Sequence, residues 1–87
     1  MEIKVIDWIP DQFNQNPKII GKVKVLLGGR MFVWMTVLKG KQRPFAKFPA
    51  IKLNDSFQPT IGWIEDDKKE RQISDEVIQI LKNRNDI

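Results

Sequence analysis

The segment of residues 18–39 constrains the fold more than any other part of the chain. In its first half, which ends at Leu27, apolar residues alternate with lysines, and a second run of strand-forming residues begins at Arg30. An alternation with a period of two is typical of a strand that is buried on one side only. Gly28 and Gly29 separate the two runs and can adopt the positive φ angles of a tight turn. The sequence therefore predicts a β-hairpin.

The length of the hairpin turn decides which side chains share a face. A two-residue turn at Gly28 and Gly29 would pair Val25 with Phe32, whereas a three-residue turn that includes Arg30 shifts the pairing by one residue. We prefer the longer turn because it separates apolar from polar side chains better. One face would then hold Val23, Val25, Leu27, Met31, Val33 and Met35, and the other would hold Lys22, Lys24, Phe32, Trp34 and Thr36.

The remaining segments complete an α+β pattern. Further strands are predicted at Glu2–Ile9, Phe45–Phe48 and Thr60–Ile64, and loops at Pro10–Pro17, Gly40–Pro44 and Asn54–Pro59. A helix is predicted at the end of the chain, with an apolar stripe formed by Ile73, Val77, Ile80 and Leu81. Asp67 with Glu70 has the spacing of a capping box, and Ser74 is a second candidate for the helix cap.

The predicted fold class is thus α+β: a small antiparallel, strongly twisted β-sheet of four to five strands with one C-terminal helix packed on it. The chain has 87 residues, which is the size of one domain, so residues 1–87 are expected to form a single domain. The sequence shows neither a signal peptide nor an apolar run long enough to span a bilayer. We therefore expect a cytoplasmic protein with no membrane partner.

The residue types that most often carry catalysis are missing from the sequence. There is no cysteine for a thiolate metal site, and no histidine to serve as general base or metal ligand. Ser56 and Ser74 are the only serines and have no histidine to activate them. The acidic group Glu65, Asp66, Asp67 and Glu70 fits no known cation-binding loop, and helix capping explains it more simply. We expect a protein that is not an enzyme and that needs no metal or cofactor.

The basic residues are concentrated in one part of the chain. Residues 12–54 carry nine lysines and arginines and no acidic residue, whereas the rest of the chain is net acidic. Such segregation indicates one positive surface that faces a polyanion. The alternative is a lysine-rich surface that serves solubility and has acidic neighbours in space.

Lysines interleaved with aromatic residues favour nucleic acid as the polyanion, because cations neutralise phosphates and flat rings stack on bases. The candidate binding residues are Lys22, Lys24, Arg30, Phe32, Trp34, Lys39, Lys41, Arg43, Phe45 and Lys47. Among them, Lys39, Lys41 and Arg43 are expected to form a phosphate-binding loop, and Trp63 is a further, weaker candidate for stacking.

Two alternatives remain open. In the first, Phe32 and Trp34 pack under a helix or a partner subunit, as buried aromatic residues commonly do. In the second, the chain is a protein-interaction module or inhibitor that binds an acidic host protein, with Met31, Met35 and Trp34 as its adhesive patch.

The order of these motifs resembles the SpoVG-like (stage V sporulation protein G) family, with this chain as a distant or phage-encoded relative. The resemblance runs from about Ile3 to Leu81. It rests on the segments IIGKVKVLL, FVW from Phe32, the turn at Gly40, PFAKFP up to Pro49, the segment 60–64, and a helix with Arg71, Ile73 and Val77. It implies a homodimer and a site-specific regulator that binds DNA and RNA. In that setting the helix would also contact nucleic acid, through Lys68, Lys69, Arg71, Lys82 or Arg84.

Overall fold

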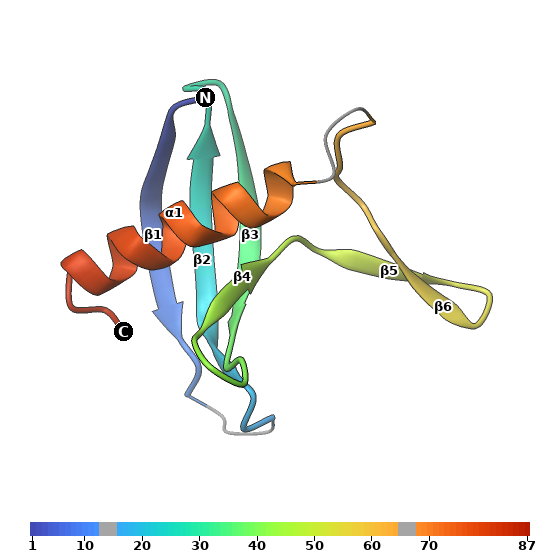
Figure 1. Cartoon of the computed structure of the whole chain (residues 1–87), viewed down its shortest axis with the longest axis horizontal. Coiled ribbons are helices and arrows are strands. Elements are labelled where there is room, and N and C mark those ends of the chain that lie inside the picture. The colour runs from blue at the N-terminus through green and yellow to red at the C-terminus, as the bar shows by residue number, and fades with distance from the viewer. Residues whose placement is uncertain (13–15, 65–67) are drawn as a thin grey trace.

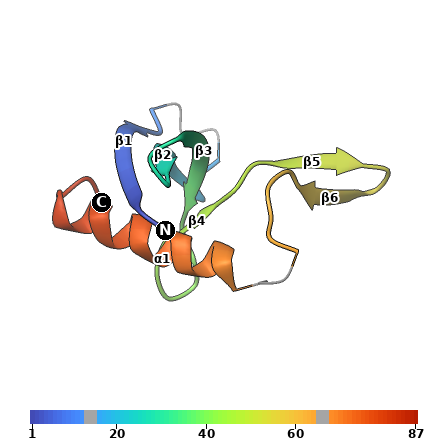
Figure 2. The ribbon, with the colours of Figure 1, turned by 90° about the horizontal axis from the view of Figure 1, so that it is seen from above.

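The computed structural model describes residues 1–12, 16–64 and 68–87 and has the predicted α+β fold (Figure 1). An antiparallel sheet holds β1 (Ile3–Pro10), β2 (Ile19–Leu27), β3 (Met31–Leu38) and β4 (Phe45–Lys47), in that spatial order; β5 (Ala50–Leu53) and β6 (Ser56–Pro59) form a second, two-stranded sheet. The helix α1 (Lys69–Asn83) crosses one face of the first sheet, and the β5–β6 hairpin projects away from both (Figure 2). No helix in the described part of the chain has the length and apolar content needed to cross a membrane.

The hairpin of β2 and β3 has the longer of the two turns considered above. Gly28 and Gly29 have φ angles of 62° and 71°, and the turn spans three residues, so that Leu27 pairs with Met31 and Val25 with Val33. The preferred register is therefore confirmed, with one exception in burial. Met31 was predicted on the apolar face, but it lies at the tip of the hairpin and is 52% exposed.

The core lies between α1 and the face of the sheet that the helix covers. Buried apolar residues come from both elements: Val23, Val25, Leu27, Val33, Met35 and Val37 from the strands, and Ile73, Val77, Ile78 and Leu81 from the helix. The helical stripe differs from the prediction because Ile78 is buried and Ile80 is only half-buried. The buried residues of the helix form two neighbouring rows on its surface, one of residues 73, 77 and 81 and one of residues 74 and 78. The centre of the buried face therefore lies between these two rows.

Ser74, the second candidate for the helix cap, does not cap the helix. It forms a hydrogen bond with the free edge of β4 instead. The helix begins at Lys69, so Ser74 lies in its second turn, where it is buried. Its Oγ accepts a hydrogen bond of 2.8 Å from the backbone N–H of Ala46, and Glu70 accepts one of 3.4 Å from Phe48. These contacts satisfy donors that an edge strand would otherwise leave unpaired. The predicted capping residue Asp67, like Glu65 and Asp66, lies outside the described residues.

We expect the substitution Ser74→Ala to lower the free energy of unfolding by about 1–3 kcal/mol, because it leaves the buried N–H of Ala46 without an acceptor. Urea denaturation of the two proteins measures the difference. Ser56→Ala is the matched control: its hydroxyl is exposed on β6, and a change within about 0.5 kcal/mol is expected. Equal losses for the two substitutions would show that the Ser74 hydrogen bond contributes nothing specific.

The segment after β4 differs from the prediction. We predicted a turn over Asn54–Pro59 and a strand over Thr60–Ile64, but the chain already turns at Asn54, whose φ angle is 57°, and residues 56–59 pair with β5. Asparagine tolerates this left-handed conformation, so a two-residue turn suffices. Residues 60–64 form no strand. Within them, Trp63 packs on the core, with its ring 5.8 Å from that of Phe48.

Candidate nucleic-acid interface

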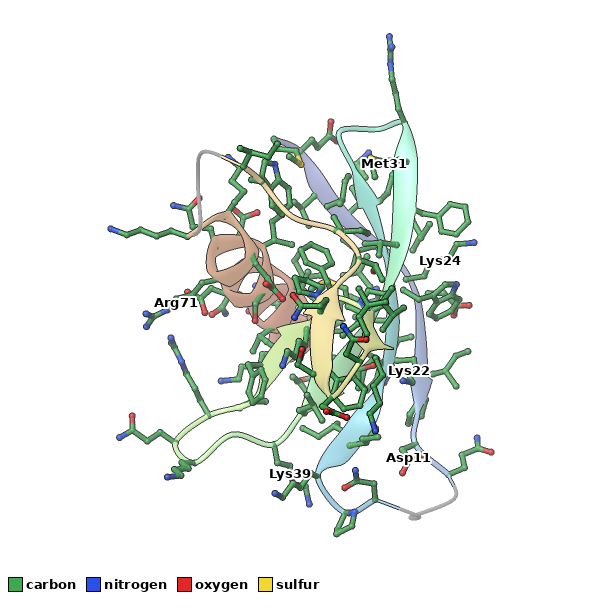
Figure 3. All side chains as sticks on the ribbon, turned by 90° about the vertical axis from the view of Figure 1, so that its right-hand side faces the viewer. Asp11, Lys22, Lys24, Met31, Lys39 and Arg71 are labelled. Carbon is green, nitrogen blue, oxygen red and sulfur yellow. The ribbon has the colours of Figure 1, made fainter. Side chains whose placement is uncertain are left out.

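The face of the four-stranded sheet opposite α1 carries most of the interleaved lysines and aromatic rings, and we call it the outer face. It includes Lys4, Asp7 and Ile9 from β1, Lys22, Lys24 and Leu26 from β2, Phe32, Trp34 and Thr36 from β3, and Phe45 and Lys47 from β4. Lys22 and Lys24 project from the sheet on the side away from the helix (Figure 3). Side chains that pair directly across antiparallel strands lie on the same face, so this set follows from the strand register.

Two aromatic rings and one ammonium group form the centre of the outer face. The Nζ atom of Lys24 lies 4.3 Å from the ring centroid of Phe32 and 5.9 Å from that of Trp34. Phe32 is 57% exposed and Trp34 is half-buried. The alternative in which these rings pack under the helix is therefore wrong, since α1 covers the opposite face.

The contact between Lys24 and the rings does not prevent a ligand from using them. A cation over an exposed aromatic ring contributes about 0.5–1 kcal/mol. A nucleic-acid base stacked on such a ring contributes about 1–3 kcal/mol. Stacking therefore outweighs the existing contact, and the displaced ammonium group of Lys24 can turn to a phosphate.

A row of polar and cationic residues crosses the sheet beside the rings. In this row Lys47 of β4 pairs with Thr36, which pairs with Lys22, which in turn pairs with Ile9 of β1. The Nζ atom of Lys22 donates a hydrogen bond of 2.7 Å to Oγ1 of Thr36. Lys22, Lys24 and Lys47 take part in none of the ion pairs found among the described residues. The charges of these lysines are thus available to an anionic ligand.

Arg30, Lys39, Lys41 and Arg43 lie away from the outer face. Arg30 and Lys39 flank β3 at its two ends, roughly 30 Å apart at 3.4 Å per residue. Lys39 and Lys41 line a separate hollow of about 400 Å³ with Phe45, beyond the end of β3. Arg43 borders another hollow of this loop, of about 260 Å³, together with Lys39, and its guanidinium group lies 3.5 Å from the Asp75 carboxylate of the helix.

Sequence reasoning missed three residues that shape the outer face. Ile9, Pro49 and Ala50 border a hollow of about 560 Å³, together with Lys22, Trp34 and Thr36. The composition of these residues carries no binding signal. Their position depends on how distant strands pair and on where the chain leaves β4.

The predicted adhesive patch of Met31, Met35 and Trp34 does not form, because Met35 is completely buried. Trp63, the weaker stacking candidate, packs against Phe48 and the core. In the residues that the structure describes, no group of three or more acidic side chains is placed to hold a metal ion.

Comparisons with protein-family models, with curated proteins and with solved structures find no match for this chain. Membership of the SpoVG-like family therefore stays a prediction from the sequence motifs.

Proposed function

We propose that this protein binds single-stranded nucleic acid on the outer face of its sheet. Lys22, Lys24 and Lys47 contact phosphates, and Phe32 and Trp34 stack on bases. The observation that carries the proposal is the position of the Lys24 ammonium group over two rings that lie outside the core, which places cationic and stacking groups on one surface. Nucleic-acid chains offer both complementary groups, phosphate and flat base, at every nucleotide.

The position of the rings supports a single strand rather than a duplex. Phe32 and Trp34 lie on β3, an inner strand of the sheet, and offer ring surfaces for stacking. A duplex hides the faces of its bases within the stack and displays only their edges in the grooves. The faces of unpaired bases are free to stack. Because every base has a flat face, this mode of binding tolerates many sequences. The proposal applies to DNA and RNA alike.

The test is a titration of a fluorescently labelled thymidine octamer, followed by its anisotropy and by tryptophan quenching. With three lysines on phosphates, the logarithm of the association constant should fall against the logarithm of salt concentration with a slope of about −2, since each contact with a single strand contributes about −0.7. A duplex of the same length should bind more weakly. Absence of binding at low salt would contradict the proposal.

A second candidate function is the protein-interaction module that binds an acidic partner. The apolar side chains of the β5–β6 hairpin favour it, because Ile51, Leu53 and Phe57 are exposed by 49–71%. A two-stranded hairpin by itself is only marginally stable in water, and a partner would stabilise it. The homodimer and the regulatory role implied by the family resemblance remain predictions, as does the cytoplasmic location.

A further inference from the structure

Two hollows on the surface of the sheet meet at a pair of residues on the outer face. The first, of about 560 Å³, lies between Trp34 and the segment that leads into β5. The second, of about 310 Å³, lies beside Pro10 and Ile19 at the end of β1 and the start of β2. Both are bordered by Ile9 and Lys22. These volumes fall in the range of roughly 300–1,000 Å³ typical of pockets for small organic groups.

The two hollows lie on opposite sides of the row of paired residues that crosses the sheet: Trp34 borders the first on one side, and Pro10 and Ile19 border the second on the other. The row runs from Lys47 through Thr36 and Lys22 to Ile9, one residue from each strand. Neighbouring strands lie about 4.8 Å apart, so the row is roughly 14 Å long. A path from one hollow to the other crosses this row at Lys22 and follows the direction of the strands. The cation of Lys22 then lies between two largely apolar recesses, the second of which also has Asp11 at its border.

We propose that a single strand of nucleic acid crosses this row, with consecutive bases in the two hollows and the phosphate between them at Lys22. The first base stacks on Trp34, against the wall formed by Pro49 and Ala50. The next base lies on the apolar surface of Ile9 and Ile19. This inference rests on the proposed function and adds the path of the ligand and the residues that hold two adjacent nucleotides.

Lys22 is held in a position that suits the linking phosphate. Its ammonium group donates to Oγ1 of Thr36 at 2.7 Å, which fixes the side chain along the row. An ammonium group has three donors, so Lys22 can keep this bond and still donate to a phosphate oxygen. Lys47, the neighbour of Thr36 in the row, is exposed and is positioned for the phosphate beyond the first base.

Substitutions of Ile9 distinguish binding along this path from general electrostatic attraction. It is 49% exposed and borders both hollows, so Ile9→Glu places a negative charge where the path crosses from one to the other. Ile51→Glu is the matched control, because Ile51 is also 49% exposed and lies on β5 outside both hollows. The two variants have the same net charge. Circular dichroism and thermal melting check that both are folded, and Ile9→Ala serves as a second variant without added charge.

Ile9→Glu is expected to bind the labelled thymidine octamer about tenfold more weakly than Ile51→Glu does. Ile9→Ala is also expected to have a lower affinity than Ile51→Glu, but by less than about tenfold. Equal affinities of all three variants would overturn the proposed path while leaving the proposed function in place. If the wild-type protein bound no octamer at all, the proposed function itself would fail.

Two anionic competitors, each eight units long, test what occupies the hollows. An abasic octamer keeps the phosphates but has no bases, and it should compete about tenfold less well than the thymidine octamer because stacking is lost. An octapeptide of glutamate should also compete poorly. Equal competition by the abasic chain would show that the hollows hold no base. Tighter binding of the peptide would assign the surface to an acidic protein instead.

Discussion

Replacing Lys22 and Lys24 together by glutamate is expected to weaken binding of a single-stranded oligonucleotide roughly a thousandfold at low salt. A charge 4 Å from a phosphate contributes about 1 kcal/mol in water, so each reversal exchanges an attraction for a repulsion and costs about 2 kcal/mol. Two reversals cost about 4 kcal/mol, which corresponds to three powers of ten in affinity. Both side chains lie outside the core, on the outer face. Because Lys24 pairs with Asp7 across the strands and the reversal places two carboxylates there, circular dichroism checks that the variant is folded.

The control is a second double reversal with the same net charge, Lys52→Glu with Lys82→Glu. Lys52 is exposed on β5 and Lys82 is exposed in the last turn of α1, so neither belongs to the outer face. We expect this variant to lose less than about tenfold, through the general field of the protein alone. If this variant lost as much affinity as the first, the result would indicate that the binding surface includes the helix, as the family resemblance implies, or that the attraction is only non-specific.

Replacing Phe32 and Trp34 together by leucine is expected to weaken binding about a hundredfold or more. The substitution keeps an apolar side chain at each position but removes the flat ring, and each stacked base contributes about 1–3 kcal/mol. The loss should persist at high salt, because stacking does not depend on counterion release. The slope of affinity against salt should therefore stay close to that of the wild-type protein, whereas the lysine variant should have a smaller slope.

Phe57→Leu is the control for the aromatic variant. Phe57 is 71% exposed on the β5–β6 hairpin, so it is at least as accessible as Phe32 without sharing its surface. Anisotropy of a labelled oligonucleotide is the suitable measurement, since the aromatic variant lacks one tryptophan. An unchanged affinity in the aromatic variant would reduce the interface to phosphate contacts and remove the reason to prefer a single strand.

The central part of the candidate interface could be predicted from the sequence because it depends on local patterns. The alternation of residues 18–27 and the glycines of the following turn determine the register, and the register places Lys24 beside Trp34. Such information lies within some twenty residues and needs no knowledge of the rest of the fold. The helix was predictable for the same reason, since its apolar stripe repeats within one segment.

The outer parts of the interface could not be predicted because they depend on irregular backbone. A shift of register between Val5 and Asp7 in β1 interrupts the alternation, so that Ile3, Val5 and Trp8 pack toward the core and Ile9 lies on the outer face. Without that bulge, Ile9 would share the face of Val5. No glycine or proline inside the strand marks the position of the bulge.

The β5–β6 hairpin escaped prediction for a different reason. Its apolar residues are exposed, and the two residues of its turn, Asn54 and Asp55, lie within a longer polar segment that reads as one loop. The next segment contains Ile61 and Trp63, which have the composition of a strand but pack against the core without pairing. Apolar composition alone does not distinguish a paired segment from an irregular one.

The most direct test of the outer face as the binding surface is a nuclear magnetic resonance titration of the ¹⁵N-labelled protein with a thymidine octamer. The proposal predicts that the indole N–H of Trp34 and the backbone amides of Lys22, Lys24 and Phe32 shift with the ligand, while the amides of α1 stay close to their free positions. Shifts confined to α1, or no shift at a saturating concentration of the octamer, would contradict it.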